Sequence, residues 1–552
     1  MPISSLNGIL IAANTGLRAS QIQLDLVSRN VTNASVDGYT RKDAPLETLV
    51  NGLSAQGVNA GEIRRSVSSS LLQEIRAGHS IAETMRVKED YLARLETLFG
   101  APGDGSSIVA KLGNLANSFR ALIGEPDSAA LQQQVLLRAD DFATSVNALS
   151  ETIQNLRLDA ERTIEAQVTI ANGYITQIDQ LNTTIAQNRG LNRSTADLDD
   201  RRDKLIADLS KIIDLRTFEQ SNGQVLVLTK LGRPLVDNDA HQLSFNASSS
   251  ISPAMSYAGG DLSGILLDGV DISSEIVGGK FRGLLDTRDD NMVTAQAQLD
   301  ELVSRVAQNF ALSDLDLFDY GDVETVVTGR TTTAIATGGS TSFTVSSAAG
   351  LSAGMNLRFA NHPTTYLVTG VAGTTISVQP ATGAGTGLDI DVPSGTAMIF
   401  AAQPGTASAG FSIRVGVNAD VDSAPWRLRD GTSTPTIGTI SQANAIPRAI
   451  VDSFERVQPF TASVGLRTGL TLTAYAGSVI VAQTTARGTL KDTLDARDSL
   501  NQQLFTRFSS ESGVNVDREL ALMIEIQSSY AASAKVIQAT RQMFDDLMSI
   551  AL

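Results

Sequence analysis

Cysteine is absent from this chain, and histidine is rare and widely spaced. Its 552 residues include no cysteine, which excludes disulfides, thiolate metal sites and cysteine nucleophiles. The three histidines, His79, His241 and His362, lie far apart, and no HExxH pair is present to bind zinc. We recognise no pairing of a nucleophile with a base. The sequence therefore predicts no enzyme, metal site or cofactor site.

Two stretches resemble ligand-binding loops but lack required residues. In DLDLFDYGD, residues 314–322, Phe318 occupies the third ligand position of an EF-type calcium loop, and no glutamate follows where one is needed. The stretch GAGTG at 383–387 lacks the Gly-Lys-Ser/Thr of a phosphate-binding loop. We interpret the first as a solvated acidic loop and the second as a turn between strands.

The composition favours long packed helices over a compact enzyme core. Aromatic residues are only 5% of the chain, with Trp426 the single tryptophan, so Leu, Ile, Val and Ala must build the cores. A formal net charge of -16 argues against nucleic acid and against an anionic membrane as partners. The first 20 residues do not resemble a cleavable signal, so a protein that leaves the cell would need another export route.

The N-terminal stretch has the apolar spacing of a coiled-coil helix. The spaced positions are Ile3, Leu6, Leu10, Ala13, Leu17, Ser20, Leu24, Val27 and Val31. They recur every three and four residues over about four heptads, which predicts a helix whose apolar face needs a partner.

This helix is predicted to end near Asn33. Asn30 and Asn33 are expected to close it, because asparagine tolerates a helix end, and Gly38 permits the following bend. Tyr39 is expected to anchor the bend by packing, and Arg41 to find a carboxylate or a carbonyl.

The last forty residues have two adjacent seams at the same spacing. The first is Leu520, Met523, Gln527, Tyr530, Ala534, Ile537, Arg541, Phe544, Met548 and Ala551. The second is Leu522, Ile526, Ser529, Ser533, Val536, Thr540, Met543, Leu547 and Ile550. A buried helix of an ordinary bundle is one interpretation. The other is that the chain ends pair with each other and also with neighbouring copies, the Ser- and Thr-containing second seam lying between subunits.

The middle of the chain predicts an elongated helical bundle with two β regions. Helical patterns cover 69–99, 106–123, 129–188, 195–214 and 282–310, and the third would span roughly 90 Å. In that helix the expected core positions are Phe142, Val146, Leu149, Ile153, Leu156, Ala160, Thr163, Gln167, Ile170 and Tyr174. Residues 215–275 alternate as a small sheet does, and FSIRVGVNADV at 411–421 is expected to rejoin it.

The fold class predicted is mainly α with β insertions. The domains expected are a polymerisation helix and connector at 1–65, paired with a C-terminal helix at 510–552; a helical rod at 66–324; an inserted β domain at 325–408; and a return of the rod at 409–509. The insert is rich in Thr, Gly, Ser and Val, and insertion at a loop tip is well tolerated.

Several of these segments resemble bacterial flagellar axial proteins. SRNVTNASVDGYTR at 28–41 is similar to their N-terminal signature, while 512–550 resembles the hook-associated protein 1 family, as do 197–215 and 223–237. The chain departs from the common NNIANxxTxGY at Arg29, and from a common DEEA at 517–520, where it has DREL. The resemblance covers both ends and most of the helical middle, and leaves out the insert.

The resemblance implies a structural protein that polymerises at the distal end of the hook and joins hook to filament. Its terminal helices would form the inner layer of a tube, with other copies, the hook protein, the second junction protein and an export chaperone as partners. It would be extracellular, exported by the flagellar type III route without a cleaved signal peptide. The assembly interface predicted consists of Leu6, Leu10, Leu17, Leu24, Val27, Asn30, Asn33, Gly38, Tyr39, Arg41, Leu520, Ile526, Tyr530, Val536, Ile537, Phe544 and Leu547.

Three alternatives remain open at this point. The chain could be another axial protein, such as the hook protein or the second junction protein. The insert could be an adhesive or carbohydrate-binding module carried on the filament, with Phe343, Phe359 and Tyr366 as its aromatics. An enzymatic insert is the third, and it lacks recognisable motifs.

Overall fold

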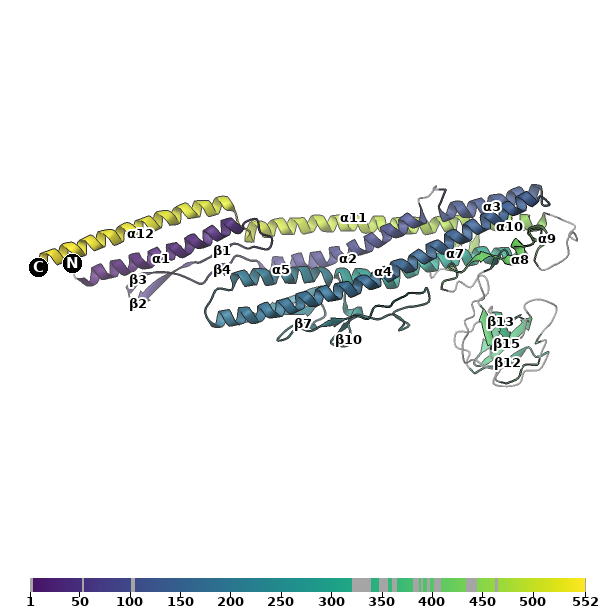
Figure 1. Cartoon of the computed structure of the whole chain (residues 1–552), viewed down its shortest axis with the longest axis horizontal. Helices are drawn as coiled ribbons and strands as arrows, with labels where there is room; N and C mark the ends of the chain where they lie inside the picture. Colours follow the sequence, from purple (N-terminus) through teal and green to yellow (C-terminus); the bar gives the residue numbers. More distant parts are fainter. Residues whose placement is uncertain are drawn as a thin grey trace.

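The computed structural model describes a long molecule whose main helices follow one axis (Figure 1). The residues described are 3–51, 54–100, 105–319, 339–346, 356–359, 365–380, 387–388, 391–394, 398–401, 409–432, 444–461 and 465–551. The expected mainly α fold with β insertions is confirmed. His362 and Asp322 lie outside the described residues, as does all of GAGTG except Gly387.

The two ends of the chain lie together as a helical pair. Helix α1, Ile3–Asn33, packs along α12, Val516–Ala551, at one extremity of the molecule (Figure 1). Beside α1 lies an antiparallel hairpin of β2, Leu46–Asn51, and β3, Ser54–Ala60. Strand β1, Lys42–Asp43, pairs with β4, Arg64–Arg65, and closes this connector between the terminal pair and the rod.

The rod is a bundle of long helices around one continuous apolar core. Its long helices are α2 Ser69–Phe99, α3 Ile108–Gly124, α4 Ala129–Gly190, α5 Ala196–Ile212, α7 Met292–Leu312 and α11 Leu472–Ser512. Shorter elements are α6 Gly279–Asp286, a π turn Thr287–Asn291, α8 Ala419–Asp422, α9 Arg427–Asp430, α10 Ala445–Glu455, and the strand pair β18 Gln458–Pro459 and β19 Gly469–Leu470.

Helix α4, 62 residues long, keeps its predicted seam only as far as Ala160. Beyond it the buried side chains are Ile164, Val168, Ala171 and Ile175, one position after each expected residue, and Ile170 is exposed. Three consecutive steps of four residues, from Leu156 to Val168, cause this shift. A straight helix of 3.6 residues per turn drifts out of a strict heptad, and such a step restores the contact.

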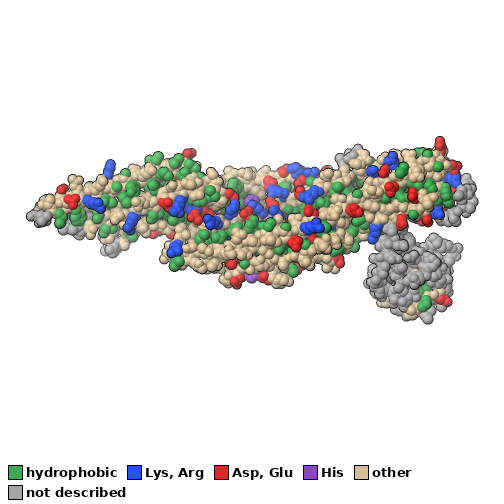
Figure 2. Space-filling view, in the orientation of Figure 1, with side chains coloured by type: hydrophobic (Ala, Val, Ile, Leu, Met, Phe, Trp, Pro, Cys, Tyr) green, Lys and Arg blue, Asp and Glu red, His purple; other side chains and the backbone are tan. Residues whose placement is uncertain are grey.

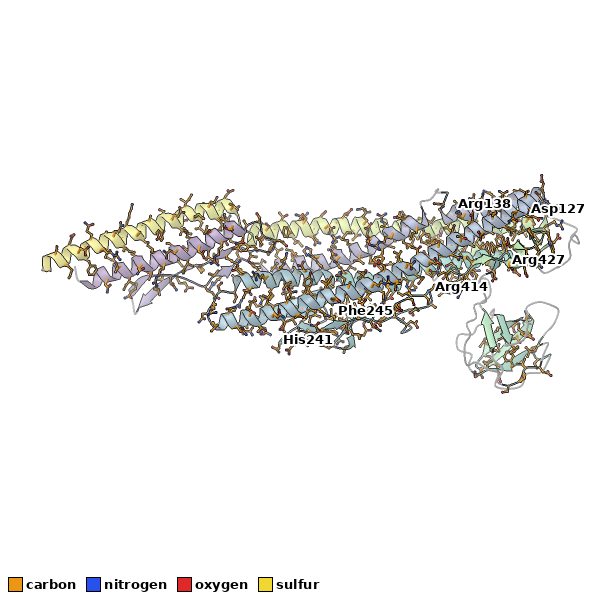
Figure 3. The ribbon with its side chains drawn as sticks, in the orientation of Figure 1. Asp127, Arg138, His241, Phe245, Arg414 and Arg427 are labelled. Carbon is orange, nitrogen blue, oxygen red and sulfur yellow. The ribbon has the colours of Figure 1, made fainter. Side chains whose placement is uncertain are left out.

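The small β region covers one side of α4 and α5. Strands β5 Leu215–Glu219, β6 Val225–Thr229 and β7 Pro234–Val236 form an antiparallel sheet. Strands β8 Leu243–Ser244, β9 Leu266–Leu267 and β10 Val270–Asp271 form a second one, followed by the short turn Ser273–Glu275. Figure 3 places His241 and Phe245 on this side of the rod, while Asp127, Arg138 and Arg427 lie at the far end.

The inserted sheet has a hydrophobic core of its own. Its strands are β12 Ser342–Thr344, β13 Asn356–Phe359, β14 Thr365–Ala372, β15 Thr375–Pro380 and β16 Met398–Ala401, in the antiparallel order β12-β15-β14-β13-β16. Phe343, Phe359 and Tyr366 are buried together within it, so these aromatics build a core and do not form an exposed stacking surface.

Residues 411–421 do not rejoin the sheet at 215–275, so that expectation is wrong. Strand β17, Gly416–Val417, pairs instead with β11, Phe318–Asp319, on the other side of the insert. The pairing brings together the two points at which the chain leaves and re-enters the rod. A short alternating stretch indicates a strand but does not indicate which strand it will pair with.

Candidate assembly interface

Helix α1 ends as expected at Asn33, and the chain then turns sharply. Gly38 has φ of +80°, a left-handed conformation that glycine adopts without strain. The Asn33 side chain donates to the carbonyl of Arg29 at 2.9 Å, within its own helix. Asp37 in the turn pairs with Lys204 of α5, so the bend is held against the rod.

Asn30 does not close the helix, as its position had suggested, but lies buried one turn earlier. Its Nδ2 donates to the Lys42 carbonyl at 2.9 Å and to Glu519 Oε2 at 3.0 Å. Its Oδ1 accepts from the Tyr39 hydroxyl at 3.0 Å and from the Lys42 amide at 3.2 Å. The amide group therefore makes four hydrogen bonds and links α1, the turn and α12.

Arg41 joins the turn to the C-terminal half of the chain. Its Nε donates to Glu519 Oε1 at 2.7 Å, and its backbone amide donates to the Ser512 carbonyl at 2.8 Å. The Glu519 side chain is 1% exposed, so its two oxygens are bound by Arg41 and Asn30 out of contact with water. A carboxylate is stable there because its charge is paired and hydrogen-bonded.

Lys42 and Thr40 attach the turn to α5. Lys42 Nζ lies 2.6 Å from Asp197 and 2.9 Å from Asp200, and 3.7 Å from the centre of the Tyr39 ring. Burial alone would lower the pKa of Lys42, but these carboxylates outweigh it and raise the pKa above its ordinary value. The Thr40 hydroxyl donates to Asp200 at 2.6 Å.

We call this set of contacts the hub, defined by Asn30, Tyr39, Thr40, Arg41, Lys42, Asp200 and Glu519. Arg65 extends it by binding Asp200 at 3.1 Å and Asp203 at 2.8 Å. The hub holds residues from α1, the connector, α5 and α12, and so fixes the terminal pair to the rod.

Between the terminal helices, the buried face differs from the predicted seams. Val27 and Ile526 are buried, as are Ala19 and Leu26 of α1 and Thr540 of α12. Half-buried positions are Leu10, Leu17, Leu24, Ile537 and Phe544, while the side chains of Leu6 and Leu547 lie outside the described residues. Ile526 and Thr540 belong to the second seam, so that seam packs on α1 at these positions instead of lying wholly between subunits.

A second apolar face of the pair is open to solvent. Leu520, Tyr530 and Val536, all predicted interface residues, are 44%, 38% and 42% exposed. The exposed large apolar side chains of the pair also include Ile9, Ile11, Ile22, Ile524, Met543 and Met548. Figure 2 shows hydrophobic side chains along this end of the molecule. An apolar face of this extent indicates a surface that binds other protein chains.

The chain is similar to known flagellar proteins. The model "Flagellar hook-associated protein FlgK helical domain" matches residues 92–312, and "Flagellar basal body rod FlgEFG protein C-terminal" matches 506–550. Flagellar hook-associated protein 1 of Salmonella typhimurium is 23% identical over 99% of this chain and 100% of its own length. That of Escherichia coli K12 is 22% identical over the same shares.

Over almost its whole length the chain is similar to flagellar hook-associated protein 1, and its helical middle matches the FlgK helical domain. The solved structure of the flagellar hook junction protein FlgK from Burkholderia pseudomallei shares its fold, with a TM-score of 0.51 and 16% identity over 79% of this chain and 99% of that one. The hook-associated family is a family of structural components of the flagellum.

The hub of this hook-associated protein includes residues that sequence reasoning did not select. Thr40, Lys42, Asp200 and Glu519 were absent from the predicted interface, although Thr40, Asp200 and Glu519 lie inside the quoted motifs and Lys42 directly follows one. The sequence shows these residues only as polar or charged side chains within or beside the motifs. Their type does not indicate which distant residue each one binds.

Across the described part of the chain, the side-chain clusters bear on metal binding and the helices on crossing a membrane. Within the ranges that the structure describes, no group of three or more His, Asp or Glu side chains could hold a metal ion. No helix among those residues is both long and apolar enough to cross a membrane.

We expect Arg41→Ala to loosen the terminal pair. The change leaves the buried Glu519 carboxylate without its cation, at a cost of about 1–3 kcal/mol, because Arg41 itself is partly exposed. Hydrogen exchange of residues 516–551 in the monomer should accelerate. Arg18→Ala, at an exposed position of α1, is the matched control and should leave exchange unchanged. Equal protection from hydrogen exchange in both variants would show that the hub does not hold the terminal pair together.

Proposed function

We propose that this chain is a structural subunit that polymerises at the distal end of the flagellar hook and joins hook to filament. The observation that carries the proposal is the terminal pair, which buries one apolar face within the chain and leaves a second one exposed. Burying that second face against other copies would stabilise an assembly by about 25 cal/mol for each Å² of apolar surface removed from water.

The hub gives this assembly its geometry. Asn30, Arg41 and Glu519 join the terminal helices to the connector, and Lys42 joins the connector to Asp200 of the rod. Copies that stack through their terminal helices would therefore also hold their rods at a fixed angle. The rod helices would then form an outer layer around a core of terminal helices. We propose that the predicted interface residues make the contacts between copies, and substitution of each can test this.

The partners proposed are further copies of the chain, the hook protein, the second junction protein and an export chaperone. Export would follow the flagellar type III route without cleavage of a signal peptide, to an extracellular position in the flagellum. We propose no catalytic activity, since the side chains that the structure brings together form ion pairs and hydrogen bonds between helices.

The deciding experiment adds purified chain to isolated hooks and then supplies flagellin. Filament growth that requires the chain supports the proposal. Gene deletion separates the alternatives: loss of a junction protein should leave hooks without filaments, whereas loss of a hook protein should leave no hooks. Either missing hooks or normal filaments in the deletion strain would contradict the proposal.

We expect residues 325–408 to be dispensable for joining hook to filament. The β11–β17 pairing holds the two sides of the insertion together, so a short Gly/Ser linker would replace it with little change in loop entropy. The measurement is export of the deletion variant and filament counts by microscopy, with the full chain as control. A variant that is secreted and folded but cannot join hook to filament would place the insert in the interface.

A further inference from the structure

A cavity of about 640 Å³ lies between the connector and the rod, next to the hub. One wall is formed by β4, which begins at Arg64, and by residues on either side of this strand. The opposite walls come from α2, from the start of α5 and from the edge strand β5, where Phe218 is exposed. The lining is mostly polar and contains five arginines.

The lining of this cavity has one more arginine than carboxylates. Five arginines line it, namely Arg64, Arg65, Arg76, Arg189 and Arg202, against four carboxylates, those of Glu62, Asp199, Asp203 and Glu219. Asp200, outside the lining, also binds Arg65, so the count alone gives no net positive charge. The lining arginine without an ion pair in the described ranges is Arg64, and a free guanidinium attracts anionic groups.

Two of these arginines have donors without an acceptor. Arg76 and Arg202 are 6% and 1% exposed, and in the residues described the Nε of each makes no hydrogen bond. Arg202 binds Asp199 at 2.9 Å through Nη2, yet burial still lowers the pKa of its guanidinium. A buried cation with an unmet donor is stabilised by any further negative charge that approaches it.

Two helices also begin at this cavity. Ser69 starts α2, Ala196 starts α5, and both line it together with Thr195. The free amides and the positive dipole end of each helix add to the field of the arginines. Asp199 in the first turn of α5 offsets part of that field, and α2 has no acidic residue in its first turn.

Arg64 is the arginine that an incoming group would meet first. It is exposed, and no ion pair with it is found across the described ranges, whereas Arg65, Arg76, Arg189 and Arg202 each pair with an aspartate. Its neighbour Arg65 is directed into the hub, where it binds Asp200 and Asp203. Arg64 is therefore a free cation at the edge of the recess.

We propose that this cavity binds the carboxylate of an acidic side chain from a second copy of the chain. This inference rests on the proposed function, in which copies stack through the terminal pair, and the connector that walls the cavity leads directly from that pair. Copies that each carry a charge of -16 repel one another when packed side by side. A recess rich in arginine on each copy offsets that repulsion at one point and sets the register between neighbours.

The test is a chemical cross-link between residue 64, at the edge of the cavity, and the carboxylate that it contacts. Arg64→Lys keeps the charge and supplies an amine that a zero-length carbodiimide joins to a touching carboxylate. Equal amounts of ¹⁵N-labelled and unlabelled variant are assembled on isolated hooks, cross-linked and digested. Mass spectrometry should find the residue 64 peptide joined to an acidic peptide of the opposite label. Arg448→Lys, at an exposed position on α10, is the matched control.

A second arm measures the energetic contribution. Arg64→Gln should weaken incorporation into hooks about tenfold, the size of one charge-assisted hydrogen bond, and the wild-type advantage should shrink at high salt. Cross-links at residue 64 that join only peptides of one label, or that reach only the hook protein, would overturn the second-copy proposal. So would incorporation of Arg64→Gln at the wild-type level.

The behaviour of the wild-type chain distinguishes failure of the carboxylate site from failure of the proposed function. If it joins hooks while the residue 64 cross-links fail, the proposed function stands and the carboxylate site does not. If the wild-type chain does not join hooks at all, the proposed function fails, and the site that depends on it is rejected with it.

Discussion

Ile526→Asp should separate the two terminal helices and prevent the chain from joining hooks. Ile526 is 5% exposed, and it lines one small cavity together with Leu26 and Val27 of α1. An unpaired carboxylate buried there costs several kcal/mol, and the two hub cations that line the same cavity, Arg41 and Lys42, already bind Glu519 and Asp200. We expect more than a hundredfold loss of co-sedimentation with isolated hooks, and faster hydrogen exchange along α1 and α12.

The matched variant is Ile524→Asp, two residues away on the same helix. Ile524 is 69% exposed, so its substitution should leave hydrogen exchange in the monomer unchanged and weaken only the joining to hooks. The contrast separates pairing within one chain from contact between copies. Aspartate at Leu24 or Ile537 should have smaller effects, because both are half-buried. Normal joining by Ile526→Asp would show that pairing of the chain ends is not required.

The positions of the helices could be predicted from the sequence because the signals that set them are local. Asn33 and Gly38 end α1 and turn the chain, and Ser128 precedes α4 close to its predicted start. The predicted core positions of α4 are wrong after Ala160, where a four-residue step replaces an expected three-residue step. Polar residues such as Thr163 and Gln167 occupy this part of the helix, so the apolar pattern does not reveal the change.

The hub could not be predicted because its partners are distant in sequence. Asn30 and Glu519 are separated by 489 positions, and Thr40 and Asp200 by 160. A buried asparagine near a helix end looks the same in sequence as one that caps the helix. Only the packing of α12 beside the turn decides that Asn30 binds a carboxylate, and the same packing decides which seam of α12 is covered.

Glu161→Ala should be the most destabilising single change in the rod. Glu161 Oε2 lies 2.6 Å from Nη1 of Arg288, and both side chains are fully buried. Oε1 also accepts from the amide of Ser248 at 3.1 Å, so the same carboxylate holds the loop of the small β region against α4. Removing one partner of a buried ion pair costs about 3–5 kcal/mol. The change should lower the midpoint of urea unfolding and deprotect residues 248–263.

Two features make Arg288 hard to accommodate once Glu161 is gone. Arg157, also buried, binds the Arg288 carbonyl at 3.0 Å, so two guanidinium groups would share one region, with Asp289 and the Ser263 carbonyl left to bind Arg288. The rings of Phe245 and Tyr257 each lie with their centres 5.9 Å from the Arg288 guanidinium, and these contacts favour its buried position.

Two controls make the expected loss specific. Glu165→Ala removes an exposed carboxylate one turn further along α4 and should change stability by about 0.5 kcal/mol or less. The double change of Glu161→Leu with Arg288→Met removes both charges and should recover most of the loss, because it leaves no buried ion without a partner. If Glu161→Ala unfolds at the same urea concentration as Glu165→Ala, then Asp289 alone neutralises Arg288, and the pair with Glu161 does not hold the β region to the rod.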